Sequence, residues 1–149
     1  MLFPILPLAR SKGGFLIAKS LLDQGIGIIQ LPCPEFKFLG PQRAPMNKEE
    51  YDSPKYRTLC RNLFTPILED IKKYLALDYS LLGILGIGES PTCSISNKRG
   101  IFMEEIFAML NEQEININYF DIPTNYTEKM NLSELYNKIK ISFNIGSMP

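Results

Sequence analysis

The sequence contains no histidine among its 149 residues. This absence excludes the serine–histidine and cysteine–histidine pairs that activate a nucleophile, and every metal site that depends on imidazole. Cysteine is scarce as well, because Cys33, Cys60 and Cys93 are the whole supply. An odd number of thiols, in a sequence without a recognisable secretory signal, argues against a disulfide framework. Chemistry would therefore use cysteine, carboxylates, hydroxyls, lysine, backbone amides or a cofactor.

An excess of either sign of charge is also lacking. The 16 basic and 16 acidic residues give a formal net charge of zero, and no basic stripe is present, so nucleic-acid binding has little support. The acidic pair Glu104–Glu105 is predicted to lie on a solvated helix face. No apolar run could span a bilayer, and residues 1–10 lack both the basic region and the cleavage site of a signal peptide. We predict one cytoplasmic domain over residues 1–149, without a membrane or nucleic-acid partner.

Hydrophobic periodicity predicts alternating strands and helices. The apolar runs Ile26–Leu31 and Leu81–Ile87 are typical of strands buried on both faces, and Ile115–Phe120 alternates as a third strand. Leu2–Leu8 could form an edge strand only, because it contains two prolines. Helices are predicted at Phe15–Gln24, at Lys55–Leu77 with a break or kink near Pro66, at Ile101–Leu110 and at Asn131–Ile141. This order predicts a three-layer, Rossmann-like α/β domain with a small parallel sheet.

Two of the cysteines follow predicted strands. Cys33 stands between two prolines after the first apolar run, and Cys93 follows the second run in “GESPTCS”. Ligands of open parallel sheets bind at the carboxyl ends of the strands, and proline fixes the backbone beside each thiol. The pattern predicts either a shared Cys33–Cys93 site, with help from the N-terminus of the helix at Ile101, or two small buried thiols. Cys60 lies on an apolar helical stripe and is predicted to pack in the core.

Three stretches resemble the 2-thiouracil desulfurase-like proteins, in particular the branch of desulfurase-related putative proteins. They are “GIIQLPCPEFKFLGPQRAPM”, “EEYDSPKYRTLCR” and “GILGIGESPTCS…RGIFMEEIFAML”. The similarity covers about residues 13–120. Two motifs carry it: Cys-Pro-Glu at 33–35, and Ser-Pro-Thr-Cys at 90–93, where the family usually has Ser-Pro-Ser-Cys-Gly.

The resemblance implies a four-iron four-sulfur cluster held by three cysteines. Its fourth iron would be open and would take sulfur from a thiolated small molecule such as a thio-nucleobase. Cys33 and Cys93 match two of the cluster ligands. Ser90 would position the substrate or a proton, and Glu35 belongs to the first motif. Gln30 stands where desulfurases proper tend to carry an acid, and an amide there weakens a general acid–base role.

The chain departs from this family in two places. The first cluster cysteine is missing from “PILPLARSKGG”, and Ser94 replaces a glycine. A third ligand would have to come from Cys60, a carboxylate, a second subunit or residues that precede this sequence.

Three functions therefore stay open, and the sequence does not decide whether the protein is an enzyme. The first is an iron–sulfur desulfurase. The second is a descendant without a cluster that binds a small molecule or a protein. A homo-oligomer is possible with either of these two functions. The third is metal-free thiol chemistry at Cys33 or Cys93, assisted by Lys98, Arg99 or a helix N-terminus.

Overall fold

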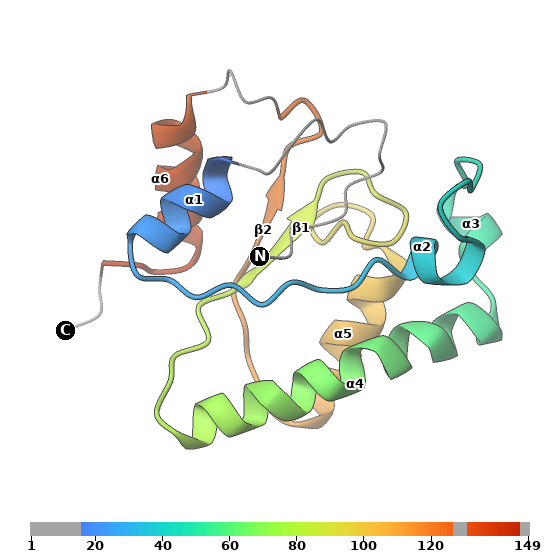
Figure 1. Cartoon of the computed structure of the whole chain (residues 1–149), viewed down its shortest axis with the longest axis horizontal. Helices are drawn as coiled ribbons and strands as arrows, with labels where there is room; N and C mark the ends of the chain where they lie inside the picture. The colour runs from blue at the N-terminus through green and yellow to red at the C-terminus, as the bar shows by residue number, and fades with distance from the viewer. Residues whose placement is uncertain (1–15, 127–130, 147–149) are drawn as a thin grey trace. The chain divides into compact units, whose positions relative to one another are not determined.

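The computed structural model describes residues 16–126 and 131–146, so the predicted edge strand at Leu2–Leu8 lies outside the described residues. The elements follow in the order α1, α2, α3, α4, β1, α5, β2, α6 (Figure 1). Contacts divide the chain into two compact units. Unit 1 combines residues 1–33 with residues 125–149, and unit 2 is Pro34–Thr124. The single domain over 1–149 stays a prediction.

Unit 1 contains the helices α1 (Leu16–Asp23) and α6 (Leu132–Ser142), which pack against each other. Both match the predicted positions. Gly25, with a positive φ of 75°, follows the end of α1, as a helix-terminating glycine does. Asn131 caps α6, because its side chain accepts the Glu134 amide at 3.2 Å.

The predicted strand at Ile26–Leu31 is wrong. The segment is an irregular connection between α1 and α2 (Figure 1). Ile28 and Ile29 are each 47% exposed. A strand forms only where its backbone pairs with a neighbouring strand, and the structure pairs this segment with none of the described residues. An apolar run is therefore not sufficient to make a strand.

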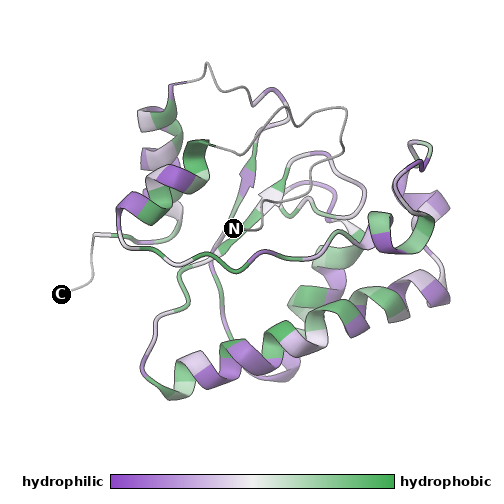
Figure 2. Ribbon diagram, in the orientation of Figure 1, coloured by the Kyte–Doolittle hydropathy of each residue, from purple (hydrophilic) through white to green (hydrophobic). Residues whose placement is uncertain are grey.

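The long helix of unit 2, α4 (Pro54–Ala76), begins where the sequence predicts. Ser53 caps it by accepting the Tyr56 amide at 3.2 Å, and Pro54 occupies the first turn. The helix continues through Pro66 without a break. Apolar and polar residues alternate along it, as they do in a helix with one apolar face (Figure 2). The buried face consists of Tyr56, Cys60, Phe64, Leu68 and Ile71.

A small parallel sheet pairs β1 (Ile84–Ile87) with β2 (Tyr119–Ile122), with Ile84 opposite Tyr119. The helix α5 (Ile101–Glu112) connects them and packs on α4. A strand, a crossover helix and a parallel strand make an α/β arrangement, as predicted. Both strands differ from their predicted bounds, because pairing rather than hydrophobicity sets where a strand starts and ends. The first is shorter than predicted, and the second begins four residues later, at Tyr119.

Ion pairs join α4 to α5. Arg57 contacts Glu104 and Glu105 at 2.8 Å each, and Arg61 contacts Glu105 at 3.2 Å and Glu112 at 2.9 Å. The Glu105 side chain is only 12% exposed. The prediction of a solvated face at Glu104–Glu105 is therefore wrong, because the arginines of α4 cover that pair.

Two short helices lie within residues 34–52. The helix α2 (Pro34–Leu39) starts inside the first motif, and it contacts α4. The helix α3 (Lys48–Tyr51) is held by a capping box at Asn47. Its Glu50 amide donates to Asn47, while the Asn47 amide donates to the Glu50 carboxylate.

Candidate functional site

The second motif forms a tight loop directly after β1. The Ser90 hydroxyl oxygen accepts the amide of Cys93 at 3.0 Å and that of Thr92 at 3.4 Å. The carbonyl oxygen of Cys93 accepts the Ile87 amide at 2.9 Å. The amide of Cys93 is therefore bonded within the loop, and its carbonyl is bonded to β1. These bonds fix the backbone from which the thiol projects.

Neighbouring elements hold the same loop from outside. Asp121, on β2, accepts the amides of Ile95 at 3.0 Å and Ser96 at 2.7 Å. Gly100, before α5, packs directly against the loop backbone. A Cβ atom there would lie 2.5 Å from the Thr92 carbonyl oxygen and 2.7 Å from the Cys93 amide nitrogen. Only glycine fits at this position.

The N-terminus of α5 binds loop carbonyls. The amide of Ile101 donates to the Pro91 carbonyl at 3.1 Å, and the amide of Met103 donates to the Thr92 carbonyl at 3.3 Å. These donors are among the first four amides of a helix, which lack partners inside it. They hold the loop backbone, so the expectation that they stabilise a Cys93 thiolate gains no support from these contacts.

A hydrogen bond joins the two motifs, which lie 57 residues apart in sequence. Thr92 is fully buried, and its hydroxyl donates to Glu35 Oε1 at 2.6 Å. The other carboxylate oxygen, Oε2, accepts from Arg43 Nε at 3.0 Å and from the Tyr51 hydroxyl at 3.3 Å. An ionised carboxylate can only accept hydrogen bonds, so it needs other donors when it is removed from water. Glu35 has three such donors.

The Thr92 oxygen also lies 3.5 Å from the Cys93 sulfur. Because Thr92 gives its own hydrogen to Glu35, the Cys93 thiol is the donor in this weak contact. The Cys60 thiol belongs to the same neighbourhood. Burial, and then the electrostatic effect of the nearby Cys93 side chain, raise the pKa of Cys60 to about 12. Cys60 is thus a buried neutral thiol, in agreement with its predicted place in the core.

Two stacked tyrosines border the Glu35 carboxylate. The rings of Tyr51 and Tyr56 are 5.0 Å apart, and both side chains are buried. Burial, and then the charge of Glu35, raise the pKa of Tyr51 to about 12. Burial, followed by the charges of Cys60, Glu35 and Cys93, raises the pKa of Tyr56 further. Within the described part of the chain, the Tyr56 hydroxyl has no hydrogen-bond partner.

The structure brings together three of the five predicted site residues. Glu35, Ser90 and Cys93 meet through Thr92 inside unit 2. Cys33 and Gln30 belong to unit 1, where both are half-buried. Their approach to Cys93 stays a prediction.

Sequence reasoning missed Thr92, Tyr51 and Tyr56. The helical spacing of α4 does place Tyr56 on a buried face, but spacing carries no information about the partner of its hydroxyl.

The two residues proposed to assist a thiol have other contacts. Lys98 pairs with Glu49, and the Arg99 guanidinium stacks over the Phe107 ring at 4.2 Å. Arg99 also lines a shallow hollow of about 420 Å³ on α5. Both cations are therefore engaged with other groups.

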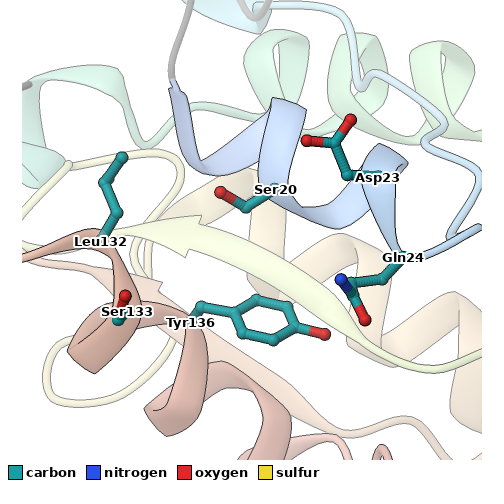
Figure 3. A pocket seen from close by; sticks show the side chains of 6 residues that line it. All are labelled: Ser20, Asp23, Gln24, Leu132, Ser133 and Tyr136. Carbon is teal, nitrogen blue, oxygen red and sulfur yellow. The ribbon is translucent and has the colours of Figure 1, made fainter.

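A second hollow, of about 250 Å³, lies between α1 and α6 in unit 1 (Figure 3). It contains no predicted site residue. Asp23, on its rim, pairs with Lys19 at 2.5 Å. Its lining is Ser20, Asp23, Gln24, Leu132, Ser133 and Tyr136.

The described residues do not fit a metal cluster. Across 16–126 and 131–146, no three Cys, His, Asp or Glu side chains form a group that could hold a metal ion. A four-iron cluster needs thiolates on its irons, and Cys60 lies fully buried on the packed face of α4. None of the three cysteines is in a disulfide.

Fold and site together define a small α/β protein with a cysteine-centred loop at the end of a parallel strand. The chain is 41% identical over 119 residues to the uncharacterized protein MJ0003 of Methanocaldococcus jannaschii, covering 79% of this chain and 76% of that protein. It belongs to the same family as MJ0003. No family model and no solved structure matches the chain. Among the helices that the structure describes, none is long and apolar enough to cross a membrane.

Proposed function

We propose that the protein is related to desulfurases and takes a thiolated small molecule, such as a thio-nucleobase, at Cys93. The observation that carries this proposal is the hydrogen bond between Glu35 and Thr92. It joins, at one place in unit 2, the two motifs on which the resemblance to desulfurases rests. The proposal includes a cytoplasmic location and a three-layer, Rossmann-like arrangement of the complete chain.

The residues around Cys93 are suited to hold a soft, neutral ligand. The sulfur of Cys93 is half-buried on a backbone that the loop, β1 and α5 fix. The Glu35 carboxylate, which bonds the neighbouring Thr92, already receives hydrogen bonds from Thr92, Arg43 and Tyr51. Its charge is therefore balanced locally, and the position beside Cys93 favours a neutral heterocycle over an anion.

Two versions of this function differ in the cofactor. In the first, an iron–sulfur-dependent desulfurase, Cys33 would have to join Cys93 as a cluster ligand together with a third ligand. Because the described residues do not fit a cluster, we assign no chemical step to it. In the second version, the protein has lost the cluster and acts as a binding module for a small molecule or a protein. The absence of the family's first cluster cysteine from “PILPLARSKGG” favours this version.

Anaerobic reconstitution with iron and sulfide separates the two versions. Iron counting and spectroscopy are applied to the wild type and to Cys33→Ala, Cys60→Ala and Cys93→Ala. Loss of iron in the Cys33 and Cys93 variants alone supports a cluster with an additional external ligand. Loss in all three makes Cys60 a ligand and contradicts its place in the core. A wild type that binds no iron under strict anaerobiosis eliminates the desulfurase version.

Calorimetry with 2-thiouracil and uracil tests the ligand itself. We expect the wild type to bind the thiolated base more tightly than the oxygen analogue, and Cys93→Ala to lose this preference. Equal affinity of the wild type for both bases would contradict the proposal.

A further inference from the structure

The hydroxyl of Tyr56 is a buried donor without a hydrogen-bond partner among the described residues. The side chain is 0% exposed. Buried hydroxyls are paired in the great majority of proteins, and leaving one unpaired costs stability. The residues around Tyr56 indicate why its hydroxyl has no partner.

The ring of Tyr56 cannot move its hydroxyl to another partner without repacking. It stacks on Tyr51 at 5.0 Å and meets the edge of Phe38 at 5.0 Å. Tyr51 lies in the same stack, yet its hydroxyl donates to Glu35 at 3.3 Å. Two adjacent phenols therefore differ: one is engaged in the Glu35 cluster, and the other is held in place with its donor unused.

The groups around the Tyr56 hydroxyl are those of the candidate site. Tyr56 precedes Cys60 by one helical turn on the buried face of α4. Cys60, Glu35 and Cys93 are each close enough for their charge to act on the phenol. Of the two thiols, Cys93 is the half-buried one, so a ligand would enter from its side.

We infer that the Tyr56 hydroxyl is the hydrogen-bond donor for the thiocarbonyl or carbonyl group of a neutral heterocycle bound beside Cys93. This inference rests on the proposed function. A tyrosine at neutral pH offers its hydrogen, so the ligand atom that meets it must be an acceptor. The ligand class is thus a cyclic thioamide or amide, whose acceptor atom replaces the missing partner. A heterocycle without such an acceptor leaves the phenol unpaired and is rejected.

The test compares Tyr56→Phe with two matched variants. Tyr51→Phe removes a hydroxyl that already makes a hydrogen bond. Tyr74→Phe removes a hydroxyl from a half-exposed tyrosine further along the same helix. Calorimetry measures binding of 2-thiouracil, under anaerobic conditions, to the wild type, Tyr56→Phe and Tyr74→Phe. Thermal unfolding without ligand compares the wild type, Tyr56→Phe and Tyr51→Phe.

We expect Tyr56→Phe to bind 2-thiouracil about tenfold more weakly, which is about 1.4 kcal/mol, while Tyr74→Phe binds like the wild type. Without ligand, the Tm of Tyr56→Phe should equal or exceed that of the wild type, and the Tm of Tyr51→Phe should fall.

Equal binding by the wild type and Tyr56→Phe overturns the inference and leaves the proposed function intact. Absence of binding to the wild type overturns both. A fall in Tm for Tyr56→Phe as large as that for Tyr51→Phe also overturns the inference, because the hydroxyl would then already have a partner, such as a buried water.

Discussion

Two segments of this chain look alike in sequence and differ in structure. Each is an apolar run that leads to a cysteine within two residues of a proline: residues 26–33 and residues 84–93. In the second segment, Ile84–Ile87 pairs with β2 and the loop that follows is bonded on several sides. In the first, no strand forms, and Ile28 and Ile29 are each 47% exposed.

The difference shows that neighbours, and not the run itself, make the ordered motif. β1 has a partner strand, an aspartate on that strand that binds the following loop, and a glycine that lets α5 approach the loop backbone. These three features come from residues 100–122, all later in sequence than the run itself. Residues 26–33 have no counterpart to them among the described residues.

The largest expected effect comes from filling the space at Gly100. Gly100→Ala should lower the free energy of unfolding by about 3 kcal/mol, because the added carbon overlaps the backbone of Thr92 and Cys93. Gly27→Ala is the matched change in the other segment, where nothing lies within 4 Å of the added carbon. It should change stability by less than about 0.5 kcal/mol. Urea unfolding of both variants makes the comparison, and equal effects would break it.

Removal of the Asp121 carboxylate should have the next largest effect. Asp121→Ala leaves the buried Ile95 amide without its acceptor, which should cost about 2 kcal/mol. Hydrogen exchange at Ile95 and Ser96 should accelerate together. Asp70→Ala serves as control, since this aspartate is exposed and its pair with Lys73 contributes little. If the two variants are equally stable, Asp121 does not hold the loop.

The hydroxyl of Thr92 should matter slightly less. Thr92→Val keeps the shape of the side chain but removes the donor to Glu35, which should cost about 1.5 kcal/mol. Thr92→Ser retains the hydroxyl and should lose less stability. A valine variant that is as stable as the wild type would show that the bond from Thr92 to Glu35 does not stabilise the fold.

The smallest effects concern two turns with positive φ, one just before the first segment and one inside the second. Gly25 has a φ of 75°, so Gly25→Ala should cost about 1 kcal/mol. Glu89 has a φ of 59° without being glycine, so Glu89→Gly should be neutral or raise stability by up to about 1 kcal/mol. Changes in the midpoint of urea unfolding measure both. Changes of the opposite sign in either variant would show that backbone strain is absent from that turn.

Local signals in the sequence predict the helices well, because their causes are local. Ser53–Pro54 and Asn131 mark helix starts, and the spacing of apolar residues gives the buried face of α4. The strand at Ile26–Leu31 and the solvated face at Glu104–Glu105 are wrong, because both depend on what another segment brings.

The residues of the site also differ in whether their role has a local cause or depends on another segment. The motifs single out Glu35, Ser90 and Cys93 in the sequence, since each stands in a distinctive local pattern. Thr92 and Tyr56 gain their meaning only from contacts made on folding: the first from Glu35, and the second from the lack of a partner among the described residues. No local pattern encodes a bond across 57 residues or an unused donor.

The central claim, that the two motifs form one site, is tested most directly by a double-mutant cycle between Glu35 and Thr92. Urea unfolding of the wild type, Glu35→Ala, Thr92→Val and the double variant gives the coupling free energy. We predict a favourable coupling of about 1.5 kcal/mol, as expected for a buried hydrogen bond to a carboxylate. A coupling close to zero would mean that the motifs are independent in solution, and it would contradict the account.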